Sequence, residues 1–212
     1  MSPSAESIKN ALAQIFVKAK VSADVLTLAG LVAGGAAGAL LYKGRWAAGA
    51  VFLLSSGVFD LLDGAVARQS GKKSIFGGIL DSSMDRYGDS FIFGGILFYY
   101  TAQANFFYAA IAFGALVGAY AISYVRARTE CERVDCRVGF WERGERLGCL
   151  FLGLVFGNLP TALGLLVLGT HWTALQRLAR ARGRSIPLLD RTRPVYYWKA
   201  AIVAGILAFF RL

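Results

Sequence analysis

Long runs without a charged residue constrain this chain more than any other feature. Val25 to Tyr42 is such a run, and it is long enough for a helix to cross a bilayer. A second run, Trp46 to Phe59, ends abruptly at Asp60. Of the 212 residues, 56% are hydrophobic and 17% are charged, whereas about a quarter of the residues in a soluble domain are charged. The composition excludes an ordinary soluble globule or a disordered chain and favours an integral membrane protein.

Two further uncharged runs are too long for a single crossing. Phe91 to Val125 is interrupted by Gln103 and Asn105, where we expect a turn between two helices. Leu147 to Trp172 is interrupted by Asn158-Leu159-Pro160, and proline disfavours helix at the residue before it. We therefore predict an all-α integral membrane protein with six transmembrane helices joined by short loops.

The two ends of the chain depart from this pattern. Residues 4–20 alternate apolar and polar side chains at helical spacing, which predicts an amphipathic helix at the membrane interface; a loosely held tail is the alternative. Residues 195–210 form a last apolar stretch that either crosses the membrane or lies at its interface. The predicted organisation is an interfacial helix (1–20), a six-helix domain (21–185) and a C-terminal apolar segment (186–212).

The basic residues predict the orientation of the chain. There are 23 Lys and Arg against 13 Asp and Glu, which gives a formal net charge of +10. With six crossings, only Lys43 and Arg45 fall on the side opposite the N-terminus, joined by Arg211 if the last stretch crosses. The positive-inside rule then places the N-terminus and the basic loops in the cytoplasm, at the cell membrane. A nucleic-acid partner is not expected, because binding nucleic acid does not require so apolar a chain.

Four aspartates lie where membrane proteins seldom carry charge. Asp60 and Asp63 are three residues apart at the end of the second predicted span, and Asp81 and Asp85 are four apart at the start of the third. Each pair shares a helix face, and a short loop brings the two helix ends together. Four such oxygen donors indicate two Mg²⁺ or Mn²⁺ ions that share carboxylates and clamp a phosphate or pyrophosphate. Helix capping and pairing with nearby basic residues are the alternative.

Three neighbours of the aspartates fit a phosphate ligand. Gly64 and Gly77 share helix faces with the aspartates, and their missing side chains let a ligand or a facing helix come close. Arg68, two turns beyond Asp60 on the same face, is placed to contact a phosphate oxygen.

The spacing of these residues resembles the signature of a known protein family. The pattern Asp-x2-Asp-Gly-x2-Ala-Arg-x8-Gly-x3-Asp-x3-Asp resembles the signature of the CDP-alcohol phosphotransferase family, and every fixed position is met. The resemblance extends over residues 22–177. It implies a homodimeric membrane enzyme that transfers a phosphate-linked group from a CDP-alcohol, usually CDP-diacylglycerol, to an acceptor hydroxyl and releases CMP.

The resemblance also implies roles for individual residues. Asp60, Asp63 and Asp81 would hold one metal ion, and Asp60, Asp81 and Asp85 the second. Asp85 would also be the general base that takes the proton of the acceptor hydroxyl. The residues implied to contact the CDP-alcohol are Asp24, Thr27, Gly64, Arg68, Ser74 and Gly77. At Asp24 the family usually has asparagine, so this chain departs from the pattern while keeping a short polar side chain.

A second stretch bears on the acceptor. Residues 123–128 and 139–146 resemble the branch of the family that makes phosphatidylinositol phosphate in bacteria, and its archaeal ether-lipid counterpart. This implies inositol 1-phosphate as the acceptor, with its phosphate bound by Arg126, Arg146 and Arg177. Three convergent cations suit a phosphate dianion. The alternative is that the arginines only follow the positive-inside bias or bind anionic headgroups of membrane lipids.

Other functions remain open at this point. Glycerol 3-phosphate also carries a phosphate and is the alternative acceptor, whereas serine has none for the arginines to bind. A cation transporter that uses the aspartates as an ion path is a remote alternative. It predicts carboxylates near the bilayer midplane on several helices, but here they lie at one edge on two.

Overall fold

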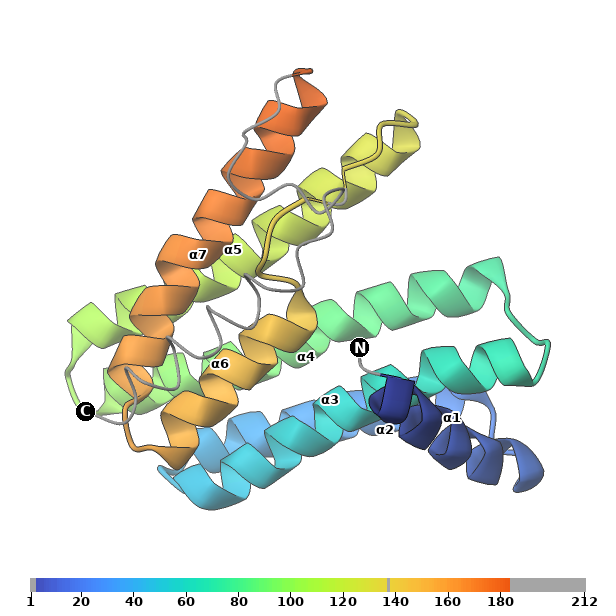
Figure 1. Ribbon diagram of the computed structural model, residues 1–212. Helices are drawn as coiled ribbons and strands as arrows, with labels where there is room; N and C mark the ends of the chain where they lie inside the picture. The colour runs from blue at the N-terminus through green and yellow to red at the C-terminus, as the bar shows by residue number, and fades with distance from the viewer. Residues whose placement is uncertain (1–2, 137, 184–212) are drawn as a thin grey trace. The chain divides into compact units, whose positions relative to one another are not determined.

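A computed structural model of the protein describes residues 3–136 and 138–183. These residues form seven α-helices and no strand (Figure 1). The helices are α1 (Pro3–Lys18), α2 (Ala23–Tyr42), α3 (Trp46–Gln69), α4 (Ile75–Ala102), α5 (Phe106–Cys131), α6 (Arg143–Val155) and α7 (Leu159–Ala181). The predicted all-α class is confirmed for this part of the chain, and α1 corresponds to the predicted N-terminal helix.

The breaks between helices fall where polar residues and proline interrupt the apolar runs. α4 and α5 are separated near Asn105, whose side chain accepts a 3.3 Å hydrogen bond from the backbone amide of Tyr108 and caps α5. α6 and α7 are separated near Asn158, and Pro160 lies in the first turn of α7, where its missing amide costs no helical hydrogen bond. Both predicted turns are confirmed.

Of the described helices, three are long and apolar enough to cross a membrane, namely α2, α3 and α5. α6 has only 13 residues, fewer than the roughly 17 that a crossing needs. α4 is long enough to cross, but it carries charged residues among its apolar ones, including Asp81 and Asp85. Six crossings therefore stay a prediction. The last apolar stretch, residues 195–210, lies outside the described residues.

The chain divides into two compact units, Met1–Gly95 and Ile96–Leu212, and the division falls inside α4. The predicted domain boundaries at residues 20 and 185 stay a prediction. In the first unit, α1 and α2 both pack against α3. Their shared core is formed by Ala13, Leu26, Leu62, Ala65 and Val66.

Glycines let α2 approach α4 closely within the first unit. A Cβ added to Gly38 would lie 2.1 Å from the carbonyl oxygen of Phe91, and a Cβ on Gly95 would lie 2.1 Å from the carbonyl oxygen of Gly38. Only glycine allows two helix backbones to come this near. This contact fixes the position of α4 beside α2.

In the second unit, α5 and α6 both pack against α7, and α5 and α7 run side by side (Figure 1). The segment of residues 138–142, which precedes α6, lies against α7. A Cβ on Gly139 would lie 2.3 Å from Cγ2 of Thr173, and Gly139 has a φ of +96°, a conformation that favours glycine. A Cβ on Gly169 of α7 would lie 1.9 Å from Nε1 of Trp141. The path of the segment therefore depends on two glycines.

Candidate active site

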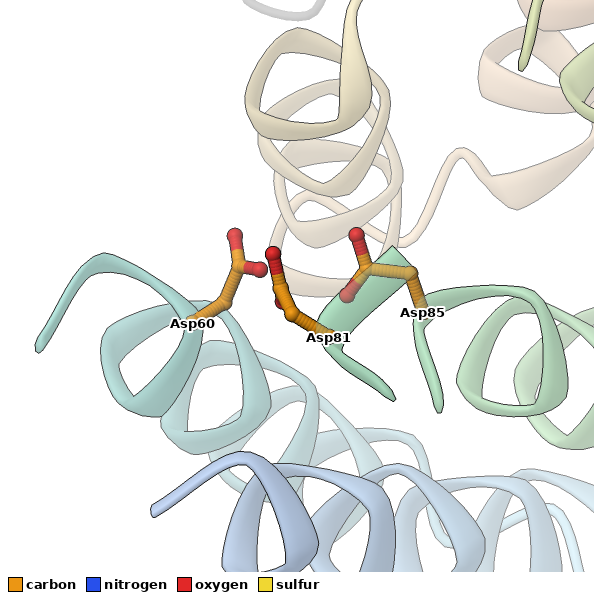
Figure 2. Close-up of side chains that lie close together, drawn as sticks. All are labelled: Asp60, Asp81 and Asp85. Atoms are coloured by element: carbon orange, nitrogen blue, oxygen red, sulfur yellow. The ribbon is translucent and has the colours of Figure 1, made fainter. Parts of the chain in front are cut away.

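Three carboxylates converge in the first unit. Asp60 lies on α3, and Asp81 and Asp85 lie on α4; each offers an oxygen, and these oxygens lie within 4.8 Å of one another. Figure 2 shows the three carboxylates directed to the same side of the two helices. Like charges this close repel one another, which favours binding of a cation among them. A set of carboxylate oxygens is the donor type that Mg²⁺ and Mn²⁺ prefer, so the residues fit a divalent ion.

A short turn brings the two helix ends together. α3 ends before Ser70, and Gly71 has a φ of +66°, which reverses the chain at low cost because glycine has no Cβ. Ser74 then caps α4 by accepting a 2.9 Å hydrogen bond from the backbone amide of Gly77. The turn places the carboxylates of both helices on neighbouring faces, as the sequence predicts.

Asp63, the fourth predicted ligand, adjoins this group. Its side chain is only 4% exposed, and Oδ2 accepts a 2.8 Å hydrogen bond from the hydroxyl of Thr27 on α2. Asp60 and Asp81 lie close enough for their negative charges to repel that of Asp63. The structure thus brings three of the four carboxylates within 4.8 Å and ties the fourth to α2.

The residues implied to contact the CDP-alcohol form small groups around the aspartates. A Cβ on Gly64 would lie 3.3 Å from Nη1 of Arg68, so the guanidinium covers this glycine. A Cβ on Gly77 would lie 3.1 Å from Oγ of Ser74 and 3.4 Å from Oδ1 of Asp24. The first turns of α2 and α4 therefore meet at a polar patch made by Asp24, Ser74 and Gly77. These contacts leave the assigned roles as predictions.

The three predicted acceptor-binding arginines lie in the second unit, around the residues that precede α6. Arg126 on α5 is 3.9 Å from Oε1 of Glu142 through Nη1, and Arg177 on α7 is 3.9 Å from the same oxygen through Nη2. Arg146 on α6, which is 4% exposed, donates a 3.2 Å hydrogen bond from Nη1 to the carbonyl oxygen of Trp141. Each predicted arginine therefore contacts residue 141 or 142.

Arg177 also holds parts of the second unit together. It is 2% exposed; Nε donates to the carbonyl oxygen of Val138 at 3.1 Å, and Nη1 donates to that of Ile122 at 2.8 Å. The thiol of Cys136 donates to the carbonyl oxygen of Arg177 at 3.2 Å. The sequence alone did not predict this role for Cys136. The contact joins residues 41 positions apart, so no local pattern indicates it.

These features define a class of protein. The described helices include three that are apolar enough to cross a membrane, and two helices present carboxylates fitted to a divalent ion. A model of the family described as CDP-alcohol phosphatidyltransferase matches residues 20–206. The chain belongs to this family and is a multi-pass membrane protein.

The chain is similar to named relatives over most of its length. It is 36% identical over 162 residues to archaetidylinositol phosphate synthase of Methanothermobacter thermautotrophicus, and the aligned region covers 74% of this chain and 80% of the relative. It is also 36% identical over 189 residues to phosphatidylinositol phosphate synthase of Corynebacterium glutamicum, and this aligned region covers 84% of this chain and 85% of the relative.

Solved structures of a related protein have a similar fold. The crystal structure of Mycobacterium tuberculosis phosphatidylinositol phosphate synthase with CDP-DAG bound matches with a TM-score of 0.76 at 30% identity, and covers 87% of this chain and 98% of that one. A structure of the same protein in complex with manganese and citrate also has a TM-score of 0.76, at 29% identity, with coverage of 86% and 92%.

Proposed function

We propose that this chain transfers a phosphatidyl group from CDP-diacylglycerol to a hydroxyl of inositol 1-phosphate and releases CMP. The observation that carries this proposal is the convergence of Asp60, Asp81 and Asp85 in a member of the CDP-alcohol phosphatidyltransferase family. The CDP-DAG bound by the Mycobacterium tuberculosis relative supports the donor. The names of the archaeal and bacterial relatives support inositol phosphate as the acceptor.

The aspartates are proposed to hold two Mg²⁺ or Mn²⁺ ions, with Asp63 on the first ion, Asp85 on the second, and Asp60 and Asp81 shared by both. Bound there, the ions would neutralise charge on the pyrophosphate of the donor. The manganese in the related structure supports a divalent ion. The hydrogen bond from Thr27 orients the carboxylate of Asp63, as bonds from an outer residue commonly orient a metal ligand.

The chain's own residues would then carry out two tasks, accepting a proton and holding the donor. Asp85 accepts the proton of the acceptor hydroxyl, whose oxygen attacks the β-phosphorus of the donor. The bond from that phosphorus to the oxygen that bridges it to the α-phosphorus breaks, and this oxygen leaves with CMP. The residues proposed to hold the CDP part are Asp24, Thr27, Gly64, Arg68, Ser74 and Gly77.

The arginines of the second unit are proposed to bind the phosphate of the acceptor. Arg146 and Arg177 each donate to backbone carbonyl oxygens, which orients them before the ligand arrives. Arg126 has a more exposed side chain, at 39%. Glycerol 3-phosphate would satisfy the same cations and is the alternative acceptor. The basic residues further support a cytoplasmic N-terminus and site in the cell membrane, and we propose that the chain acts as a homodimer.

The experiment is an acceptor panel. Purified protein is supplied with CDP-diacylglycerol and Mg²⁺, and CMP release is measured with inositol 1-phosphate, free inositol, glycerol 3-phosphate or serine. We expect release with inositol 1-phosphate that stops on chelation of the metal. Release with glycerol 3-phosphate alone would replace the proposed acceptor, and absence of release with every acceptor would contradict the proposed transfer.

A further inference from the structure

One carboxylate lies where the acceptor phosphate is proposed to bind. Oε1 of Glu142 is 3.9 Å from Nη1 of Arg126 and 3.9 Å from Nη2 of Arg177. These distances are too long for hydrogen bonds, but close enough for the carboxylate to compensate both positive charges. The two arginines come from different helices, α5 and α7, and face the same oxygen.

Both arginines are held by groups other than Glu142. Arg177 is buried, and its Nε and Nη1 donate to the carbonyl oxygens of Val138 and Ile122. Arg126 donates from Nε to Glu130 at 2.8 Å. Each arginine would therefore keep these other hydrogen bonds if the carboxylate of Glu142 moved away. The two arginines are preorganised for another anion.

Glu142 is placed to turn toward solvent. Its side chain is 31% exposed, and it stands at the N-cap of α6. Rotation of its side chain toward solvent needs no change in the backbone. A phosphate group brings three acceptor oxygens and nearly two negative charges, against the single charge of the carboxylate.

We propose that Glu142 is a resident counter-anion, which the phosphate of the acceptor displaces from between Arg126 and Arg177. This inference rests on the proposed function and adds an exchange step to it. The acceptor phosphate is not consumed in the transfer, so the lipid product still carries it. The returning carboxylate of Glu142 then competes with that phosphate and favours release of the product.

Binding of inorganic phosphate to the full chain tests the exchange, measured by calorimetry in detergent without a CDP-alcohol. Glu142→Gln should bind phosphate roughly fivefold more tightly than the wild type, because the competing charge is gone while the side-chain size is kept. The matched control is Glu132→Gln, which removes the same charge from an exposed pair with Arg128 on α5 and should change the affinity less than about twofold.

The outcomes separate this proposal from a merely structural role. If Glu142 served only to orient the arginines, Glu142→Gln would bind phosphate more weakly, which would overturn the exchange; an unchanged affinity would do the same. Glu142→Ala repeats the measurement if the glutamine variant does not fold.

A second experiment adds phosphatidic acid to the micelle, to test a lipid headgroup as the source of the phosphate. If Glu142→Gln bound only this lipid more tightly than the wild type, the proposal would also be overturned. Failure of the acceptor panel is a separate result, because phosphate binding requires neither donor nor metal.

Discussion

The acidic group of the first unit and the basic group of the second are both clusters of like charge, but they are built in opposite ways. The carboxylates of Asp60, Asp81 and Asp85 lie within 4.8 Å of one another, an arrangement that costs free energy until a cation binds. Arg126 and Arg177 instead share an anionic partner and also bond to other oxygens. Arg86 lies 3.6 Å from Oδ2 of Asp85, but one positive charge does not balance three carboxylates, so the acidic group favours a further cation from solution. The basic group shares Glu142 and can exchange one anion for another.

The largest effect is expected at the acidic group. Asp85→Asn removes the proposed base and a charge from the cluster, so CMP release should fall about 1,000-fold or more. The measurement is CMP release under saturating Mg²⁺, with folding checked by size-exclusion chromatography. Glu132→Gln serves as the control, because its carboxylate pairs with Arg128 on an exposed helix surface. Wild-type turnover in Asp85→Asn would remove this residue from the chemistry.

The second prediction concerns stability in the basic group. Arg177→Met leaves the carbonyl oxygens of Val138 and Ile122 without their buried donors, which should lower the free energy of unfolding by about 3 kcal/mol. Arg126→Met should lower it by less than about 1 kcal/mol, since the Arg126 side chain is 39% exposed. The midpoint of heat-induced loss of the monodisperse protein measures both. Equal losses would show that the two arginines do not differ in this way.

Much of the fold could be predicted from local sequence. The turns between α4 and α5 and between α6 and α7 occur at Asn105 and Pro160, because capping and the missing amide of proline act within a few residues. The convergence of Asp60, Asp81 and Asp85 follows from helix periodicity and a short turn. Both inferences need only neighbours along the chain.

Contacts between distant residues could not be predicted in the same way. The Thr27–Asp63 hydrogen bond spans 36 positions, and it sets Asp63 apart from aspartates that share its motif. The carbonyl oxygens that hold Arg177 likewise belong to residues 39 and 55 positions away. Such contacts depend on how closely the helices pack, which no local pattern specifies.

A third prediction tests whether helix packing positions the acidic group. Gly95→Ala places a Cβ against the carbonyl oxygen of Gly38, which should lower the free energy of unfolding by about 2 kcal/mol. Gly94→Ala is the matched control, because a Cβ there meets nothing within 4 Å among the described residues. Thermal midpoints compare the two. If the α2–α4 contact also fixes the carboxylates, Gly95→Ala should need more Mg²⁺ for half-maximal CMP release, while Gly94→Ala should not.

The smallest expected effect lies at the hydrogen bond from Thr27. Thr27→Val keeps the shape of the side chain but removes the hydroxyl that donates to Asp63, so the carboxylate loses an orienting contact. Losing such an outer contact commonly weakens a metal site, here by about tenfold in the Mn²⁺ concentration for half-maximal CMP release. Thr101→Val is the control, since its hydroxyl donates to the carbonyl oxygen of Leu97 within its own helix. The acidic group should respond in its metal dependence alone, with phosphate binding at the basic group unchanged. An unaltered Mn²⁺ requirement would mean that Asp63 needs no orientation by α2, and a change in phosphate binding would mean that the two groups are not independent.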